Sequence, residues 1–228
     1  MNLENLWAEI EAEQAWRIDE IRFFQNQLVH LTDEGEKERF RRALVLLLYA
    51  HFEGFCKFAL LHYVSAVNST GITCREANNA LVAASLAEMF QELRNPDKKS
   101  SIFRADLPDD AKLHRFARDR EFVERAADFY STNVNIPDGV VDTESNLKPI
   151  VLRKNLYRLG FQHDQFETIE GKIHWLLEDR NKISHGELKS GVQVTRYEKL
   201  REAAFLIMNT IKSDVMRALE NKEYLRPV

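Results

Sequence analysis

The feature that most constrains the fold is a long apolar stretch in the first third of the chain. Residues 36–68 predict a single helix whose middle, from Ala43 to Val64, is apolar on nearly every side. A helix of that kind is normally the central helix of a bundle or a membrane span. Four polar or charged side chains interrupt the apolar run: His51, Glu53, Lys57 and His62. Because charges at the centre of a bilayer are costly, we expect a buried bundle helix and no membrane contact.

Six further segments have helical periodicity or capping signals. They cover residues 3–31, 73–94, 109 or 110 to 130, 148–159, 164–186 and 195–221. Several predicted helices begin with a pair spaced as a capping box: Asp33/Glu36, Thr73/Glu76, Asp164/Glu167 and Thr195/Glu198. The chain has only 8 Gly and 5 Pro, which leaves few turns. The sequence therefore predicts an all-α bundle of about six to seven helices around a long central one.

Residues 131–148 lack the helical pattern. This stretch contains Pro137, Gly139 and several β-branched residues, so we expect an ordered loop or a small hairpin insertion. No repeat or change of composition divides the chain. We therefore expect residues 1–228 to form one helical domain, which is long enough to bury a sizeable core.

Charge and cysteine content narrow the class of protein. The net charge of −4 means that any contact with nucleic acid must come from a local basic patch. The only two cysteines, Cys56 and Cys74, both fall in predicted helices and make no disulfide framework. The first residues, MNLENLWAEIEAE, are acidic and unlike a signal peptide. A cytoplasmic location is expected.

A polar motif closes the helix predicted at 164–186. The segment Arg180-Asn181-Lys182-Ile183-Ser184-His185-Gly186 supplies a fixed cation, an amide, a hydroxyl and a base that titrates near neutrality. These groups suit the handling of a phosphodiester in RNA. The spacing itself is weak support, since an Arg followed five positions later by a His is expected about 0.6 times by chance. The spacing also occurs at Arg158 and His163.

Helix geometry limits how this motif can work. Five residues along an ideal helix leave two side chains about 140° apart, so Arg180 and His185 cannot share a face of an unbroken helix. The helix must end between them, as Gly186 suggests, or a second copy must complete the site. Arg180 also continues the buried stripe of its helix and needs a partner. Glu53 is the candidate carboxylate: it either forms a structural ion pair with a nearby Arg or orients Arg180 in a catalytic cleft.

Three segments together resemble the HEPN-domain proteins of prokaryotic toxin and defence systems. These are HFEGFCKFAL, LRKNLYRLGF and LLEDRNKISHGE. In that superfamily an Arg, four to six further residues and a His form a ribonuclease signature, matched here by Arg180, Asn181 and His185. The resemblance implies an all-helical domain that forms a homodimer and cleaves RNA without a metal or cofactor, with an antitoxin or defence-system protein as a partner.

The chemistry of the residues supports a specific hypothesis. Neutral His185 would take the proton from a ribose 2′-hydroxyl, giving 2′,3′-cyclic phosphate and 5′-hydroxyl ends. Arg180 would stabilise the charge on the phosphorane and Asn181 would hold a phosphate oxygen. Lys182 and Ser184 would contact RNA, or would serve only as a solvated cation and a helix cap.

Two other interpretations remain from the sequence. One is a non-catalytic HEPN-like module that binds RNA, nucleotide or a protein partner, or that acts only as a dimerisation subunit of a defence complex. The other concerns His51 and His62, which are eleven residues apart on the central helix and lie there either as metal ligands or as histidines satisfied within the core.

Overall fold

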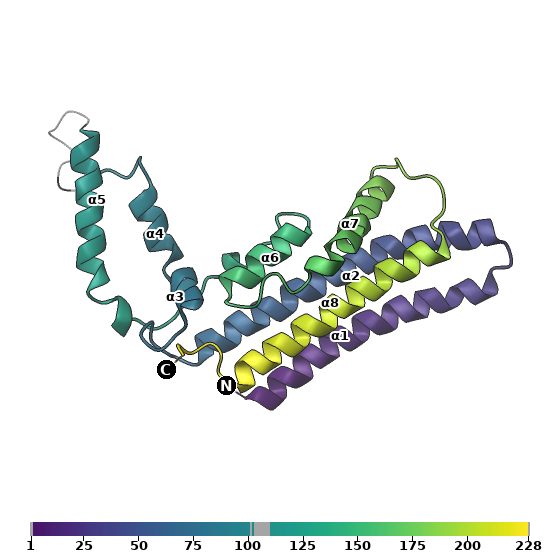
Figure 1. Ribbon diagram of the computed structural model, residues 1–228, viewed down its shortest axis with the longest axis horizontal. Helices are drawn as coiled ribbons and strands as arrows, with labels where there is room; N and C mark the ends of the chain where they lie inside the picture. The colour runs from purple at the N-terminus through teal and green to yellow at the C-terminus, as the bar shows by residue number, and fades with distance from the viewer. Residues whose placement is uncertain (1, 101, 103–109, 228) are drawn as a thin grey trace.

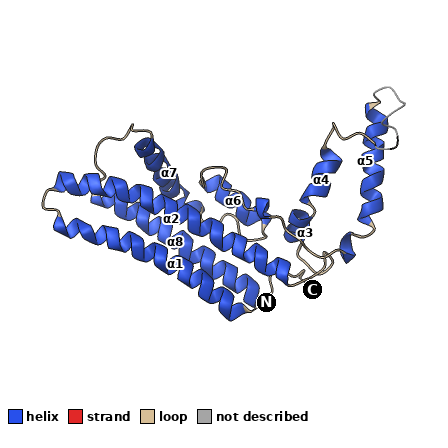
Figure 2. Ribbon diagram, turned by 180° about the vertical axis from the view of Figure 1, so that it is seen from behind, coloured by secondary structure: helices blue, strands red, loops and turns tan. Residues whose placement is uncertain are grey.

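The fold is an all-α bundle with a projecting helical arm (Figure 1). The computed structural model describes residues 2–100, 102 and 110–227. Within that part of the chain there are eight α-helices and no named strand, as Figure 2 shows. The helices are α1 (Leu3–Asn26), α2 (Glu34–Ser69), α3 (Asn79–Ser85), α4 (Ala87–Arg94), α5 (Ala111–Ala126), α6 (Pro149–Arg158), α7 (Glu170–Ser184) and α8 (Val194–Glu220).

The three longest helices, α1, α2 and α8, lie side by side and form the body of the bundle (Figures 1 and 2). α2 contacts α1, α7 and α8, which confirms that it is the central helix. Among the described residues, α2 is the one helix long and apolar enough to cross a membrane, and 56% of its most apolar window is buried within the protein. Fully enclosed side chains such as Phe52 and Phe55 account for the apolar run in the sequence.

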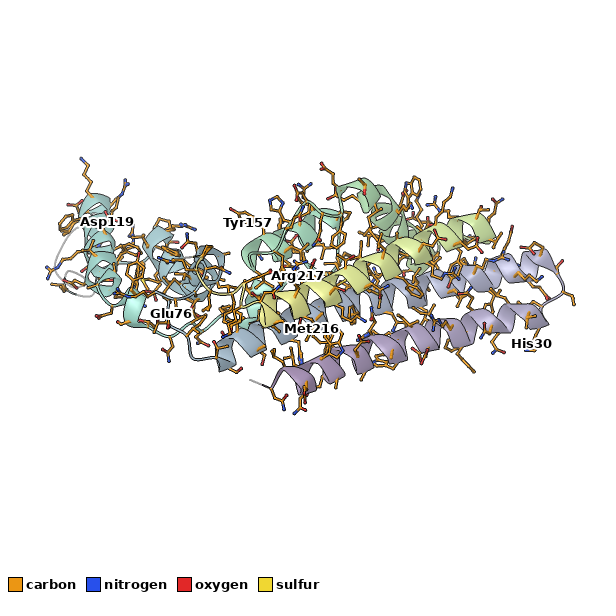
Figure 3. The ribbon with its side chains drawn as sticks, turned by 60° about the horizontal axis from the view of Figure 1, so that its bottom comes forward. His30, Glu76, Asp119, Tyr157, Met216 and Arg217 are labelled. Atoms are coloured by element: carbon orange, nitrogen blue, oxygen red, sulfur yellow. The ribbon has the colours of Figure 1, made fainter. Side chains whose placement is uncertain are left out.

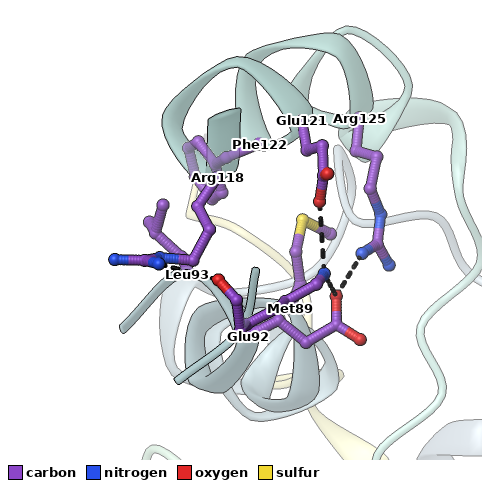
Figure 4. Close-up of a pocket in the computed structure, with 8 residues that line it drawn as sticks. Met89, Glu92, Leu93, Arg118, Glu121, Phe122 and Arg125 are labelled. Carbon is purple, nitrogen blue, oxygen red and sulfur yellow. Dashed lines mark hydrogen bonds and ion pairs between the residues drawn. The ribbon is translucent and has the colours of Figure 1, made fainter. Parts of the chain in front are cut away.

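α6 and α7 form a second layer over the bundle, and α3, α4 and α5 form the arm (Figure 1). α7 packs on α2 and α8, while α6 joins α7 to α3. In the arm, an ion-pair network ties α4 to α5: Glu92 Oε2 lies 3.0 Å from Lys98 Nζ and 2.8 Å from Arg125 Nη1, and Lys98 Nζ lies 3.2 Å from Glu121 Oε2 (Figure 4). The arm therefore carries its own polar contacts outside the bundle core.

Several helix ends follow the predicted chemistry. The Asp33 side chain accepts the backbone N–H of Glu36 at 2.9 Å and begins α2. Asp110 begins α5 in the same way, whereas Asp109, the alternative cap, lies outside the described residues. α6 ends before Gly160, whose φ of +81° is a conformation that a side chain would strain.

Three predicted starts were wrong. Thr73 and Glu76 are hydrogen bonded at 2.8 Å, but they close a turn, and α3 begins six residues after Thr73. Asn78 caps it, because its Oδ1 accepts the Leu81 N–H at 3.0 Å. α8 begins at Val194, with no side-chain cap at the preceding residue. A 3₁₀ turn, Glu167–Ile169, precedes α7 at its expected cap.

The predicted helix over residues 73–94 is also broken at Leu86, which separates α3 from α4. This break is the reason that eight α-helices are present where about six to seven were expected. The first of them, α1, is followed by a short 3₁₀ turn, Gln27–His30, that completes the predicted 3–31 segment.

Residues 131–148 form an ordered loop with short 3₁₀ turns and no hairpin. Its β-branched apolar side chains, such as Val134 and Ile136, are buried against the rest of the protein, whereas Thr132 is exposed. The Asn68 side chain accepts the Ile136 N–H at 2.8 Å and donates to its carbonyl at 2.9 Å. Asn68 thus pairs both backbone groups of Ile136, while residues 132–134 pair with residues 72–74 through one isolated antiparallel bridge and form no strand.

Candidate functional site

The motif segment lies at the C-terminal end of α7, where the helix closes with a Schellman motif. The Glu187 N–H donates to the Lys182 carbonyl at 2.8 Å, and the Gly186 N–H donates to the Ile183 carbonyl at 3.1 Å. Gly186 has φ +74°, the left-handed conformation that this turn requires. His185 is the capping residue between helix and turn. The predicted end of the helix at this glycine is confirmed.

The chain after the motif is fastened to α2. The Val192 N–H donates to the Glu38 carbonyl at 2.9 Å, and Arg42 Nη1 donates to the Lys189 carbonyl at 2.5 Å. Gly191 allows this approach, since a Cβ there would overlap the Glu38 side chain. The connection from α7 to α8 therefore holds His185 in a defined place relative to α2.

Arg180 is half-buried and is held by three neighbours. Its Nη1 donates to Asn181 Oδ1 at 2.8 Å and to Asn146 Oδ1 at 3.1 Å. The guanidinium also lies over the Tyr49 ring, 5.1 Å from the centroid, a cation–π contact. The need for a partner, inferred from the buried stripe, is thus met by two amides and an aromatic face.

Glu53 affects the residues around Arg180 through the hydroxyl of Tyr49. Burial, followed by the charge of the Glu53 carboxylate, raises the pKa of the Tyr49 hydroxyl, while nearby Arg180 opposes the shift. The same hydroxyl accepts the Leu147 N–H at 2.8 Å. Within the described residues no ion pair joins Glu53 to Arg180. The expected direct pair is therefore replaced by a shared neighbour, and Glu53 lies beside the cluster.

The buried ion pair of α7 belongs to the residue before Arg180. Asp179 is only 6% exposed, and it accepts two hydrogen bonds from Arg196 on α8, Nε to Oδ2 at 2.7 Å and Nη2 to Oδ1 at 2.9 Å. Such a bidentate pair fixes the rotation of α7 against α8. Sequence reasoning missed it, although Asp179 lies three residues after Leu176 on the buried stripe.

The remaining motif residues face solvent. Lys182 Nζ lies 2.5 Å from Glu178 Oε1, and this hydrogen bond raises the pKa of Lys182. Ser184 is the last residue of α7 and is exposed. The exposed His185 imidazole has no hydrogen bond or ion pair to any described residue, and none joins it to Arg180. His185 is therefore free at the surface, whereas Arg180 is anchored toward the interior of the subunit.

The other histidines on α2 are paired with carboxylates of α1. His51 Nε2 lies 2.7 Å from Glu20 Oε2, and His62 Nε2 lies 2.8 Å from Glu9 Oε2. Burial lowers the pKa of His51. No group of three or more metal-ligating side chains occurs among the described residues. Each Nε2 atom lies within ion-pair distance of a carboxylate but makes no hydrogen bond to a described residue. The contacts therefore match the interpretation of His51 and His62 as core histidines, although their Nε2 atoms are not fully satisfied.

Two groups at the site were not found from the sequence. Tyr49 lies four residues before Glu53 on α2, so helical spacing offered a signal for that pair. Asn146 comes from the 131–148 loop, more than thirty residues from Arg180 in sequence, and no local pattern marks it. The loop that resisted prediction therefore supplies a residue that positions the motif.

An all-α bundle with an Arg–His motif at the end of a helix defines the class of HEPN domains. The family described as MAE_28990-like HEPN matches the chain over residues 6–224. The chain belongs to this family, in a superfamily of nucleases and RNA-related modules. No curated protein and no solved structure matches the chain.

Proposed function

We propose that the protein is a metal-independent endoribonuclease that acts as a toxin or in antiviral defence. The observation that carries the proposal is the pairing of an anchored Arg180 with a free His185 at one helix end. Membership of the HEPN family supports the same class of activity.

The proposed reaction is an internal transesterification of RNA. His185 takes the proton of a ribose 2′-hydroxyl, and the oxygen attacks the adjacent phosphorus. The bond from phosphorus to the 5′ oxygen breaks, and that oxygen takes a proton, leaving 2′,3′-cyclic phosphate and 5′-hydroxyl ends. Arg180 stabilises the charge on the equatorial oxygens, and Asn181 holds one of them. Lys182 and Ser184, both exposed within the motif, contact the RNA backbone.

The geometry favours a site shared by two copies. Arg180 points into its own subunit toward Tyr49 and Asn146, whereas His185 faces solvent. A second copy, related by a two-fold axis, places each His185 near the Arg180 end of the other subunit and forms one RNA cleft. We therefore propose a homodimer as the active form, with an antitoxin or other defence protein as its regulator.

The test compares two histidines on the same helix. Purified wild type, His185→Ala and His174→Ala are incubated with mixed RNAs in EDTA. His174 is also exposed on α7 and is the matched control. Loss of a general base should slow cleavage by about 10²–10⁴-fold in His185→Ala only. Equal cleavage by all three proteins refutes the role of His185, and a 3′-hydroxyl product refutes attack by the 2′ oxygen.

A non-catalytic HEPN-like module that binds RNA, nucleotide or a protein partner is the second candidate. One observation favours it: the described hydrogen bonds of Arg180 are to Asn146 and Asn181, and none connects it to His185. RNA that is bound but left intact by wild type under every buffer condition would select this function over cleavage.

A further inference from the structure

A wide cleft separates the arm from the second layer of the bundle. It encloses about 1100 Å³ and is lined by α3 and α4 on one side and by α6 and the 131–148 loop on the other. Neither Arg180 nor His185 lines it. We call this space the arm cleft.

Part of the lining of the arm cleft consists of small residues. Ala80, Ala83 and Ala84 come from α3, while Gly139 and Gly160 come from the opposite side. Small lining residues leave room for a planar group, and the volume of the cleft exceeds that of a typical pocket for a drug-sized ligand.

Each wall of the arm cleft carries an aromatic ring. On α4, the Arg94 guanidinium lies over the Phe90 ring at 5.7 Å. On α6, the Tyr157 ring makes an edge contact with His163, their centroids 5.4 Å apart. Tyr157 is 68% exposed, and Figure 3 shows it on α6 at the side of the arm. Its hydroxyl and outer face are available to a ligand.

The cations of the arm cleft lack carboxylate partners. Arg158 Nη1 donates only to the Val140 carbonyl at 3.3 Å, and Arg94 has no ion pair, within the described residues. Many other arginines of this acidic chain pair with Asp or Glu, as Arg17 and Arg125 do. Among the described residues that line the cleft, Glu88 is the one acidic residue. A local excess of positive charge in a chain of net charge −4 indicates an anionic ligand.

We propose that the arm cleft binds a nucleotide, with the base stacked on Tyr157 and the phosphate held by Arg94 and Arg158. Aromatic faces that accept any base and arginines that accept phosphate are the two parts of a single-strand binding surface. The nucleotide is either a free mononucleotide or one unit of a single-stranded RNA. The inference goes beyond RNA cleavage, since the arm cleft is separate from the α7 motif.

The test measures binding under conditions in which cleavage cannot occur. The probes are a fluorescent 2′-O-methyl RNA octamer, which has no 2′-hydroxyl, and AMP, with inorganic phosphate for comparison. The variants are Tyr157→Ala and the double variant Arg94→Gln/Arg158→Gln. Arg22→Gln on the exposed side of α1 is the matched control. Circular dichroism and Tm establish that each variant is folded.

The expected results separate the two sources of ligand. If RNA is the ligand, Tyr157→Ala should raise the Kd of the octamer about tenfold. In the double variant the slope of log K against log salt should become shallower by about 1.4, the contribution of two phosphate contacts on a single strand. If these losses occur for AMP but not for the octamer, a free mononucleotide is the ligand.

Two outcomes overturn the inference. Octamer and AMP binding that is unchanged in both variants, or changed equally by Arg22→Gln, excludes the arm cleft as the site. Failure of both probes to bind wild type also overturns it, as would be seen if the cleft received a protein helix. Neither outcome depends on whether His185 cleaves RNA, so the two proposals fail independently.

Discussion

Two buried tyrosines allow the energetic role of the Tyr49 hydroxyl to be isolated. In Tyr49→Phe the ring beneath Arg180 remains, but the acceptor for the buried Leu147 N–H is lost. An unsatisfied buried donor costs about 1–3 kcal/mol of unfolding free energy. For a chain of this size each kcal/mol corresponds to about 2–4 °C in Tm. We therefore expect Tyr49→Phe to lower the free energy of unfolding and the Tm.

Tyr197→Phe is the matched control with the opposite expectation. The Tyr197 hydroxyl is buried on α8 and has no hydrogen-bond partner among the described residues. Removing a buried polar group that lacks a partner should leave stability unchanged or raise it by about 1 kcal/mol. Urea unfolding of the three proteins supplies the measurement. If Tyr49→Phe is as stable as wild type, or Tyr197→Phe loses more than Tyr49→Phe, the hydroxyl of Tyr49 does not hold the 131–148 loop.

Two further predictions concern ionic contacts. Arg196→Met leaves the Asp179 carboxylate without its bidentate partner. We expect urea unfolding to show a loss of about 1–3 kcal/mol in the free energy of unfolding, moderated by the exposure of Arg196. A loss below about 0.5 kcal/mol would show that solvent replaces the pair. Burial lowers the pKa of His51 from its ordinary 6.5, and Glu20 opposes the shift. Because the folded protein favours neutral His51, the contribution of His51 to the free energy of unfolding is fully present above pH 6.5 and declines as the pH falls below it. Glu20→Gln lowers that pKa further, and its deficit relative to wild type should widen below pH 6.5; a deficit that is constant with pH would contradict the assignment.

The fold was predictable where the apolar pattern and helix-capping residues of the sequence match the side chains that are buried in the structure. The apolar run of α2 and the glycines after α6 and α7 mark elements that the structure confirms. The break at Leu86 was not predictable, because nothing in its immediate sequence differs from a helix interior. The backbone there turns within the arm, so that α4 can pack on α5, a contact between distant segments.

The location of the candidate site was predictable to a greater extent than its environment. The end of α7 and the inward direction of Arg180 follow from Gly186 and from the buried stripe. Tyr49 and Asn146 did not follow, since they meet Arg180 only through the packing of α2 and the 131–148 loop on α7. The burial of Arg180 predicted a carboxylate partner, but an arginine is also satisfied by amides and an aromatic face.

Within one subunit Arg180 is anchored inward and no described hydrogen bond joins it to His185, which leads to a prediction about how two copies share the chemistry. If each site takes Arg180 from one copy and His185 from the other, a dimer of one Arg180→Gln and one His185→Ala subunit retains one complete site. Each variant alone should be inactive. After subunit exchange in an equal mixture, half of the dimers are mixed and each has one of two sites, which gives about a quarter of wild-type activity.

The measurement is RNA cleavage by the mixture, with the oligomeric state followed by light scattering. A site built within one subunit predicts no recovery, because every subunit in the mixture lacks one of the two residues. A monomer at micromolar concentration would also refute the shared site. Recovery of activity would instead explain why Arg180 is anchored inward while His185 is free at the surface, because each residue would complete a site with the opposite copy. The fixed connection from the end of α7 to α2 would then set the distance between Arg180 of one copy and His185 of the other.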